Sequence, residues 1–213
     1  MSKISKEQLF SISHRFYHDK LPKVFVETGT FRGATIERIN ALFSVIHTFE
    51  LNRELWEMAA EKFQPQQNIY CHLENSVEGL EQLSPNIKEP IVFWLDAHYS
   101  GQGTTFGSEE TPLLKELGLI CQRKYKDIII IDDMNCFGVK AEFPGDGMYK
   151  PFVYDWRSTT VKNIKRSIGW KITHLLNPFD KYKLIILTNL NITEKLQLIL
   201  MERLRQIRYK LKI

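Results

Sequence analysis

Two apolar runs without polar alternation most strongly constrain what this chain can fold into. They are PIVFWLDA at residues 90–97 and KDIIIIDD at residues 126–133. Continuous apolar strands are typical of parallel sheets that are covered by helices on both faces. A helix start at Thr111-Pro112 lies between the two runs, as the crossover of a β-α-β unit requires. The runs therefore predict neighbouring parallel strands in an α/β sheet.

Strands and helices alternate in the same way along most of the chain. Further strands are predicted at residues 23–29, 45–51 and 68–74, with a closing pair within residues 170–189. Helical periodicity falls between them, and a leading helix is predicted at residues 5–20. We therefore predict a doubly wound, mostly parallel, seven-stranded Rossmann-like sheet with helices on both faces and a C-terminal antiparallel hairpin. Residues 1–192 form this α/β domain, and residues 193–213 add a basic amphipathic helix that belongs to it.

The composition fits one globular domain with a sizeable core. The chain has 213 residues, of which 43% are hydrophobic and 25% are charged. Its first residues do not resemble a signal peptide, and no apolar run reaches the roughly 18 residues that a membrane span needs. Cys71, Cys121 and Cys136 are scattered and form no CxxC pair. We therefore expect reduced thiols in a cytoplasmic protein.

The formal net charge of +4 is concentrated at the C-terminus. The last eleven residues contain no acid and five basic residues, namely Arg203, Arg205, Arg208, Lys210 and Lys212. The rest of the chain therefore carries a net charge of −1. Nucleic-acid binding needs a basic face along the fold, so we expect no nucleic-acid partner.

The same C-terminal segment has apolar residues at helical spacing. These are Leu196, Leu200, Leu204, Ile207 and Leu211. In one interpretation the helix packs on the sheet or on a partner subunit of a homo-oligomer, and its cations complement the helix dipole. In the other interpretation it lies on an anionic membrane surface. The sequence leaves both open.

Each predicted parallel strand ends in acidic or amide groups. In order, these are Glu27; Glu50; Glu74 with Asn75 and Ser76; Asp96 with His98; and Asp132 with Asp133. One strand that ends in Asp is unremarkable, because Asp is common in turns. Ligands of such sheets bind outside the carboxyl ends of the strands. Polar groups at all five ends therefore favour one shared ligand pocket.

A glycine-containing loop, ETGTFRGAT at residues 27–35, joins the first strand to the first crossover helix. Gly29 permits a tight turn with positive φ, and Gly33 permits close packing at the helix start. The spacing does not match the dinucleotide pattern GxGxxG. Glu50, which follows Glu27 by 23 residues at the next strand end, can accept hydrogen bonds from both hydroxyls of a ribose. A nucleoside without a pyrophosphate fits these features better than NAD or ATP.

The loop resembles the first motif of class I S-adenosylmethionine (SAM)-dependent methyltransferases, in particular the metal-dependent O-methyltransferases of the catechol and caffeoyl-CoA type. The resemblance covers roughly residues 20–190 by order of elements. It implies that Glu27, Thr28, Gly29 and Gly33 lie along the methionine part of SAM and that Glu50 holds the ribose. It also implies that Asn75 and Ser76 border the adenine and that Asp96 contacts the cofactor.

Asp96, Asp132 and Asp133 end neighbouring strands and are predicted to form a metal site. Three converging carboxylates without a paired Lys or Arg repel one another unless a divalent cation neutralises them. Oxygen ligands suit Mg²⁺, Mn²⁺ or Ca²⁺, and we expect Mg²⁺. The metal-dependent relatives carry their ligands at the same places, and Asn135 is a weaker candidate for an outer ligand.

His98 is the candidate general base. An alcohol is a poor nucleophile while it keeps its proton, and a His pKa near 6.5 suits proton removal at neutral pH. A His at this place resembles the macrocin and mycinamicin sugar O-methyltransferases, in which such a residue is the base. The other histidines are interpreted as ordinary polar residues; they are His14, His18, His47, His72 and His174.

The predicted function is therefore methylation of a hydroxyl on a sugar or glycoside, as in glycan modification. A catechol-type acceptor is the first alternative, since the glycine loop matches it equally well. A non-catalytic nucleoside-binding module is the second, although it would need neither the three carboxylates nor His98. RNA as the acceptor is disfavoured by the nearly neutral body of the protein.

Two segments beside the predicted site are candidates for contacts with the acceptor. Residues 100–110 are a solvated loop or a substrate lid. Residues 133–156 are rich in aromatic side chains, which commonly stack on sugars or planar acceptors. Their candidate contacts, each equally well explained by packing, are Tyr149, Phe152, Tyr154 and Trp156.

Overall fold

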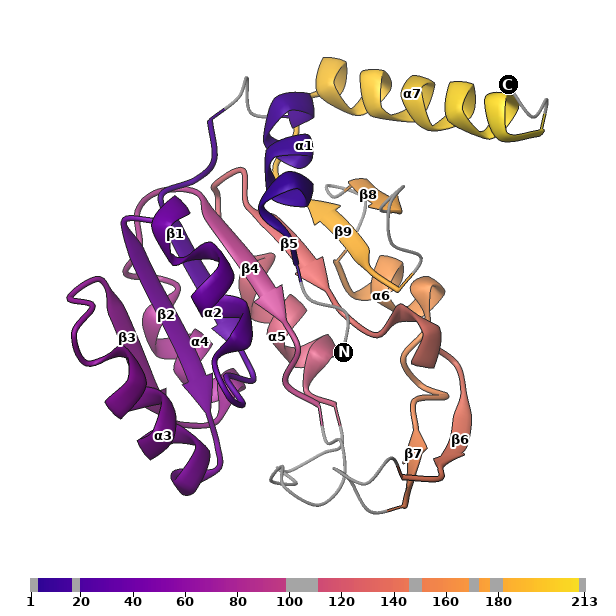
Figure 1. The fold of residues 1–213 in the computed structure, drawn as a ribbon. Helices are drawn as coiled ribbons and strands as arrows, with labels where there is room; N and C mark the ends of the chain where they lie inside the picture. Colours follow the sequence, from indigo (N-terminus) through magenta and orange to yellow (C-terminus); the bar gives the residue numbers. More distant parts are fainter. Residues whose placement is uncertain are drawn as a thin grey trace.

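The computed structural model describes residues 4–16, 20–98, 111–145, 151–168, 173–176 and 182–210 of the chain. Its centre is a seven-stranded sheet with the order β3-β2-β1-β4-β5-β9-β8 (Figure 1). The strands are β1 (Val24–Thr28), β2 (Val45–Glu50), β3 (Ile69–Leu73), β4 (Ile91–Leu95), β5 (Ile128–Ile131), β8 (Thr173–Leu176) and β9 (Leu184–Leu187). β1 to β5 are parallel, whereas β9 runs antiparallel to both β5 and β8. The predicted α/β sheet with its C-terminal hairpin is confirmed.

Helices cover both faces of this sheet. One face packs against α1 (Lys6–Phe16), α2 (Ala34–Ile39), α3 (Arg53–Phe63) and the start of α7 (Ile192–Lys210). The other face packs against α4 (Ser76–Leu83), α5 (Leu113–Ile120) and α6 (Val161–Ile168). Short 3₁₀ turns follow α2 at Asn40–Leu42 and β5 at Met134–Cys136. None of the described helices combines the length and apolar composition needed to cross a membrane.

The central strands show why their sequences lack polar alternation. Trp94 of β4 and Ile130 of β5 pack into the first core cluster, whereas Phe93 and Ile129 pack into the second. Both faces are buried, so every position along these strands is apolar. Burial of each such side chain contributes roughly 1.5–3 kcal/mol to the free energy of unfolding.

The segment that connects β5 to α6 contains a feature that was not predicted from the sequence. It forms a small antiparallel hairpin of β6 (Lys140–Phe143) and β7 (Phe152–Asp155), separate from the main sheet (Figure 1). Each strand has only four residues, and their side chains are exposed or half-buried. The alternation of apolar and polar residues is therefore too short to stand out.

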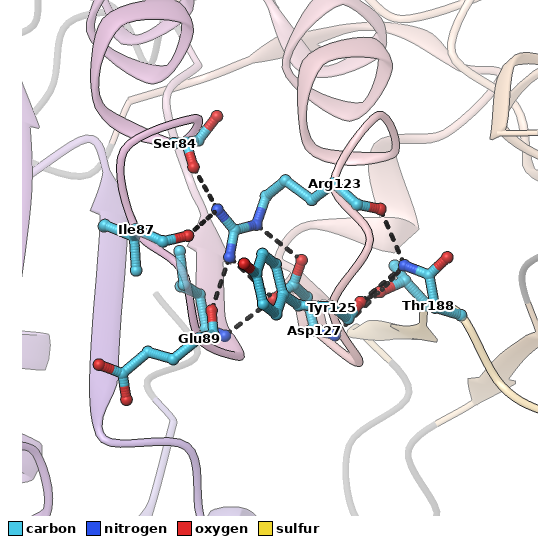
Figure 2. Close-up of polar contacts among 9 residues, drawn as sticks. Ser84, Ile87, Glu89, Arg123, Tyr125, Asp127 and Thr188 are labelled. Atoms are coloured by element: carbon cyan, nitrogen blue, oxygen red, sulfur yellow. Dashed lines mark hydrogen bonds and ion pairs between the residues drawn. The ribbon is translucent and has the colours of Figure 1, made fainter.

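The predicted helix start at Thr111-Pro112 is followed by α5. This helix ends at Ile120, because the chain turns there and the side chain of Arg123 folds into the protein. The Arg123 guanidinium donates to the backbone oxygens of Ser84, Ile87 and Glu89 (Figure 2). Its Nε also donates to Asp127 Oδ2 at 2.9 Å.

Asp127 extends this network to the strands. Its Oδ1 accepts from the backbone N–H of Ile91, and its own N–H donates to Thr188 Oγ1 (Figure 2). Burial raises the pKa of Asp127 to about 6, although hydrogen bonding and charge from Arg123 act in the opposite direction. The network ties together the starts of β4 and β5 and the end of β9, at the amino edge of the sheet.

Candidate active site

The opposite, carboxyl edge of the sheet gathers the predicted site residues. The backbone N–H of Asp96 donates to Thr28 O at 3.1 Å, and that of Asp132 donates to Leu95 O at 3.2 Å. Gly29 donates to Phe49 O at 3.0 Å. The ends of β1, β2, β4 and β5 are therefore joined side by side, as their parallel order requires.

Both glycines of the loop after β1 occupy conformations that require glycine. Gly29 has φ 84°, and a Cβ there would lie 2.6 Å from the backbone oxygen of Asp96. Gly33 has φ 69°, precedes α2, and would place a Cβ 2.6 Å from the ring of Phe63. The predicted tight turn and close packing are confirmed. The loop thus passes directly over the end of β4.

Glu27 lies beneath this loop and is almost fully buried. Thr48 Oγ1 donates to Glu27 Oε2 at 2.8 Å, and Thr30 Oγ1 lies 2.6 Å from Thr48 Oγ1. Burial raises the pKa of Glu27 to about 8, while hydrogen bonds from Thr48 and Thr35 oppose the rise. Glu27 therefore carries its proton at neutral pH unless a positive group comes close.

Glu50 is fixed at the end of β2 by two backbone groups. Its Oε2 accepts from Phe31 N–H at 2.8 Å, and its Oε1 accepts from Asn52 N–H at 2.9 Å. Phe31 has φ 48°, a strained value for a residue with a side chain. Each carboxylate oxygen keeps capacity for a further hydrogen bond.

The polar pair after β3 begins a helix. Asn75 is the N-cap of α4, and its Oδ1 accepts from Val77 N–H at 2.9 Å. Ser76 is buried in the first turn. Capping accounts for an Asn at this place.

His98 lies between two carboxylates. Its Nδ1 is 3.3 Å from Asp96 Oδ1, and its Nε2 is 3.1 Å from Asp133 Oδ2. The imidazole also meets the ring of Trp156 edge-on, with centroids 5.2 Å apart. Asp133 has φ 55°, a left-handed value that Asp adopts more often than most residues with a side chain. The imidazole is therefore held from three directions.

Asp132 lies beside this cluster, and its charge acts on Asp96. It is buried, and its Oδ1 is 3.9 Å from Nζ of Lys183, a fully buried lysine that also lies 5.6 Å from the centroid of the Trp94 ring. Lys183 was not predicted as a site residue. Because β9 is antiparallel, its first residues lie at the same edge as the last residues of β4 and β5. The predicted antiparallel hairpin could therefore have indicated that Lys183 lies near the site.

The electrostatics of the cluster reflect an excess of acids. Burial raises the pKa of Asp96 well above its usual value, and the charges of Asp132, Asp133 and Glu27 raise it further. Lys183 supplies a positive charge that the prediction of a cation from three carboxylates did not include. A partner with positive charge would nevertheless be stabilised at this edge.

The fit of a metal ion can be tested on the donor atoms. One ligand atom each from Asp96, His98 and Asp133 lie within 4.8 Å of one another. The carboxylate oxygens suit Mg²⁺ or Mn²⁺, whereas an imidazole nitrogen is a better ligand for Zn²⁺ or Fe²⁺. Two of the three predicted ligands therefore belong to the group, while Asp132 is paired with Lys183. Asn135 is exposed, and its amide lies against Cys136 Sγ.

A pocket opens beside the cluster and is lined in part by His98, Thr111, Asp132 and Trp156. Trp156 is only 3% exposed and also stacks on Phe137, so it is a packing residue that supports His98. The predicted lid at residues 100–110 lies outside the described residues, as does Tyr149.

Two aromatic residues of the β6–β7 hairpin lie close to this region. Phe152 packs against Phe143 and Tyr154, with centroids 5.4 and 6.4 Å away. The pKa of Tyr154 is raised by burial and by its neighbours Cys136 and Asp133. Tyr154 is therefore near the acid–imidazole cluster, and an acceptor bound there could reach it.

The remaining histidines with described side chains have other surroundings. His47 Nδ1 is 3.0 Å from His72 Nε2 on the adjacent strands β2 and β3. Burial and, to a smaller extent, the neighbouring His72 lower the pKa of His47 to about 4. This pair forms part of a stack with Tyr70 and Phe49 and contributes nothing to the acid–imidazole cluster.

Solved structures share this fold at low sequence identity. A SAM-dependent methyltransferase from Clostridium acetobutylicum is 14% identical, with a TM-score of 0.51 over 88% of this chain and 93% of that chain. A Podospora anserina methyltransferase with bound S-adenosylhomocysteine (SAH) is 16% identical, with a TM-score of 0.52 and coverages of 84% and 75%. The N-methyltransferase NodS from Bradyrhizobium japonicum is 10% identical, with a TM-score of 0.50 and coverages of 87% and 96%.

No protein-family model and no curated protein matches the sequence. The structural likeness defines the fold, which is that of the class I SAM-dependent methyltransferases. The strand order and the antiparallel strand β9 belong to this class.

Proposed function

We propose that the protein transfers the methyl group of SAM to a hydroxyl group of a sugar or glycoside, with His98 as the general base. The observation that carries this proposal is the position of His98. Its ring is held between Asp96 and Asp133 at the sheet edge where the glycine loop passes over β4. Binding a nucleoside alone requires no such arrangement.

The loop and the ends of β1 to β4 would hold the cofactor. Glu50 would accept hydrogen bonds from the ribose hydroxyls, and Asn75 and Ser76 would border the adenine. The methionine part would lie along residues 27–29 and Gly33, near Asp96. Its ammonium group would favour ionisation of Glu27, whose buried carboxyl otherwise keeps its proton. The SAH bound in the Podospora anserina methyltransferase is consistent with this assignment.

The contacts of His98 suggest how it would act. Asp96 is the less exposed of its two partners, at 16% against 27% for Asp133. The acceptor hydroxyl would replace Asp133 at Nε2, while Asp96 keeps Nδ1 and stabilises the imidazolium that forms. The hydroxyl proton moves to Nε2, the oxygen bonds to the methyl carbon, and the carbon–sulfur bond breaks to leave SAH as a thioether.

A divalent cation, with Mg²⁺ expected, is the second part of the proposal. Asp96 and Asp133 would hold it, and Nε2 of His98 would stay available to accept the hydroxyl proton. When bound, such an ion lowers the pKa of an acceptor hydroxyl. EDTA should then stop turnover, and Mg²⁺ should restore it. Full activity in EDTA would exclude the cation and leave His98 as the activating group.

The cofactor can be tested by calorimetry. Micromolar binding of SAM or SAH is expected, and Glu50→Ala should weaken it at least tenfold because a charged double hydrogen bond is lost. Glu57→Ala is the matched control, since Glu57 is an exposed residue of α3 that lies 4.0 Å from Arg53. Absence of SAM binding would refute the methyltransferase proposal.

A panel of acceptors separates the remaining alternatives. Turnover with vicinal sugar diols and none with catechols or amines would support the proposed acceptor class. Preference for a catechol would favour the small-molecule alternative. SAM binding without transfer to any acceptor oxygen or nitrogen would favour the non-catalytic binding module.

A further inference from the structure

Helix α7 exposes a row of large apolar side chains. The exposed fractions are 79% for Ile192, 61% for Leu196, 43% for Ile199, 58% for Leu200 and 51% for Leu204. Leu198 is buried in the core and anchors the helix. Leu198 and Leu200 differ by about 200° around a helix, so the exposed row faces away from the anchored side. An exposed apolar face of this kind usually marks an interaction site.

The start of the helix is firmly attached to the protein. Asn191 Oδ1 accepts from Glu194 N–H, and Glu194 Oε2 accepts from Asn191 N–H, which forms a reciprocal cap. Glu194 also pairs with Lys126, in the turn before β5. From there α7 extends beyond the body of the molecule (Figure 1). Its exposed row is therefore held in a fixed direction.

The charge of the chain changes sharply along α7. All five charged residues from position 203 onward are basic, whereas the rest of the chain carries a net charge of −1. An apolar row followed by a basic segment complements a surface that is apolar inside and anionic outside.

Arg203 distinguishes a lipid surface from a second copy of the chain. It is exposed and lies four residues after Ile199 and three after Leu200, so it shares their face of the helix. A dry helix–helix interface would bury its charge, which is costly. In a lipid headgroup layer, Arg203 can reach phosphates while its stem stays among the apolar side chains. We propose that α7 docks the protein on anionic lipid membranes.

This docking would leave the candidate active site open to solution. Leu187 at the end of β9 pairs with Ile128 at the start of β5, so α7 begins at the amino edge of the sheet. The cluster around His98 lies at the opposite edge. Turnover of a soluble acceptor is therefore expected to be independent of docking.

Vesicle flotation of the full-length protein tests the proposal. Binding is expected with equal parts of phosphatidylglycerol and phosphatidylcholine, and not with phosphatidylcholine alone. It should fall at least tenfold when salt is raised to about 1 M, because exposed charges are then screened. The double variant Leu200→Ser, Leu204→Ser should also lose at least tenfold. Met58→Ser is its matched control, as Met58 is 56% exposed on α3.

A charge reversal tests the role of Arg203 by itself. Arg203→Glu should weaken vesicle binding several-fold, whereas Arg53→Glu, which changes another highly exposed arginine, should not. Equal flotation of all variants, or no flotation of the full-length chain, would overturn the proposal. A dimer in sedimentation that Leu200→Ser, Leu204→Ser dissociates, without flotation, would assign the face to a second copy. Methyl transfer by these variants reports separately on the proposed function.

Discussion

Both edges of the sheet bury charged groups, but the proportion of acidic to basic side chains differs between them. At the amino edge, the guanidinium of Arg123 meets Asp127 and three backbone oxygens. At the carboxyl edge, the acids outnumber the cations among the described residues. The pKa of Asp127 is about 6, whereas that of Glu27 is about 8.

The backbone differs between the edges as well. Phe31 and Asp133 hold left-handed conformations at the carboxyl edge. Asp tolerates this conformation, as does Asn189 at the amino edge, so Phe31 is the strained position. The side chain of Asn189 donates to the backbone oxygens of Arg123 and Tyr125. The contacts of the amino edge therefore stabilise the fold. The carboxyl edge keeps a strained backbone and an excess of acids, as functional sites commonly do.

Removing Arg123 should have the largest effect on stability. Arg123→Met leaves Asp127 buried without its partner and frees three backbone oxygens, so the free energy of unfolding should fall by about 3–5 kcal/mol. Urea denaturation measures this change. Arg157→Met is the control, because Arg157 is exposed and its solvent-screened pair with Asp155 should contribute little to stability. Similar losses in both variants would show that the amino edge has no special role in stability.

Removing Lys183 should cost less. Its Nζ lies 3.9 Å from Asp132, compared with 2.9 Å between Arg123 and Asp127. Lys183→Met should therefore lower the free energy of unfolding by about 1–3 kcal/mol. Lys126→Met is the control, since it removes a more exposed pair with Glu194. An unchanged or increased stability would show that Lys183 is not the counter-charge of Asp132.

The pH dependence of stability should differ between the two edges. The folded-state pKa of Glu27 is raised from 4.5 to about 8, so the folded state keeps a proton that the unfolded state loses in this interval. The stability from this group is present below pH 4.5 and is lost as pH rises to about 8, by up to about 1.4 kcal/mol per pH unit.

Glu27→Gln should remove this dependence between pH 6 and 8 in denaturation curves. The stability contributed by Asp127 also decreases as pH rises, but this decrease is complete by about pH 6. Glu74→Gln serves as the control at the same edge. A decline above pH 6 that persists in Glu27→Gln would assign it to another group.

Most of the fold could be predicted from the sequence, because burial on both sheet faces requires the continuous apolar runs of β4 and β5. Only part of the candidate site could be predicted from the sequence. Asp96 and His98 are only two residues apart in the sequence, so a short distance between their side chains could be expected. Asp132 and Asp133 are adjacent and diverge, one toward Lys183 and the other toward His98. The β6–β7 hairpin and the support from Trp156 depend on contacts that no local pattern encodes.

The turnover of His98→Ala with an acceptor that the wild type methylates decides whether the carboxyl edge is a catalytic site. If His98 is its base, kcat should fall by roughly 10²–10⁴ while the affinity for SAM stays within about twofold. His72→Ala, which removes an imidazole from the pair on β2 and β3, should leave kcat unchanged. A His98→Ala protein as fast as the wild type would contradict the assignment of His98 as the base.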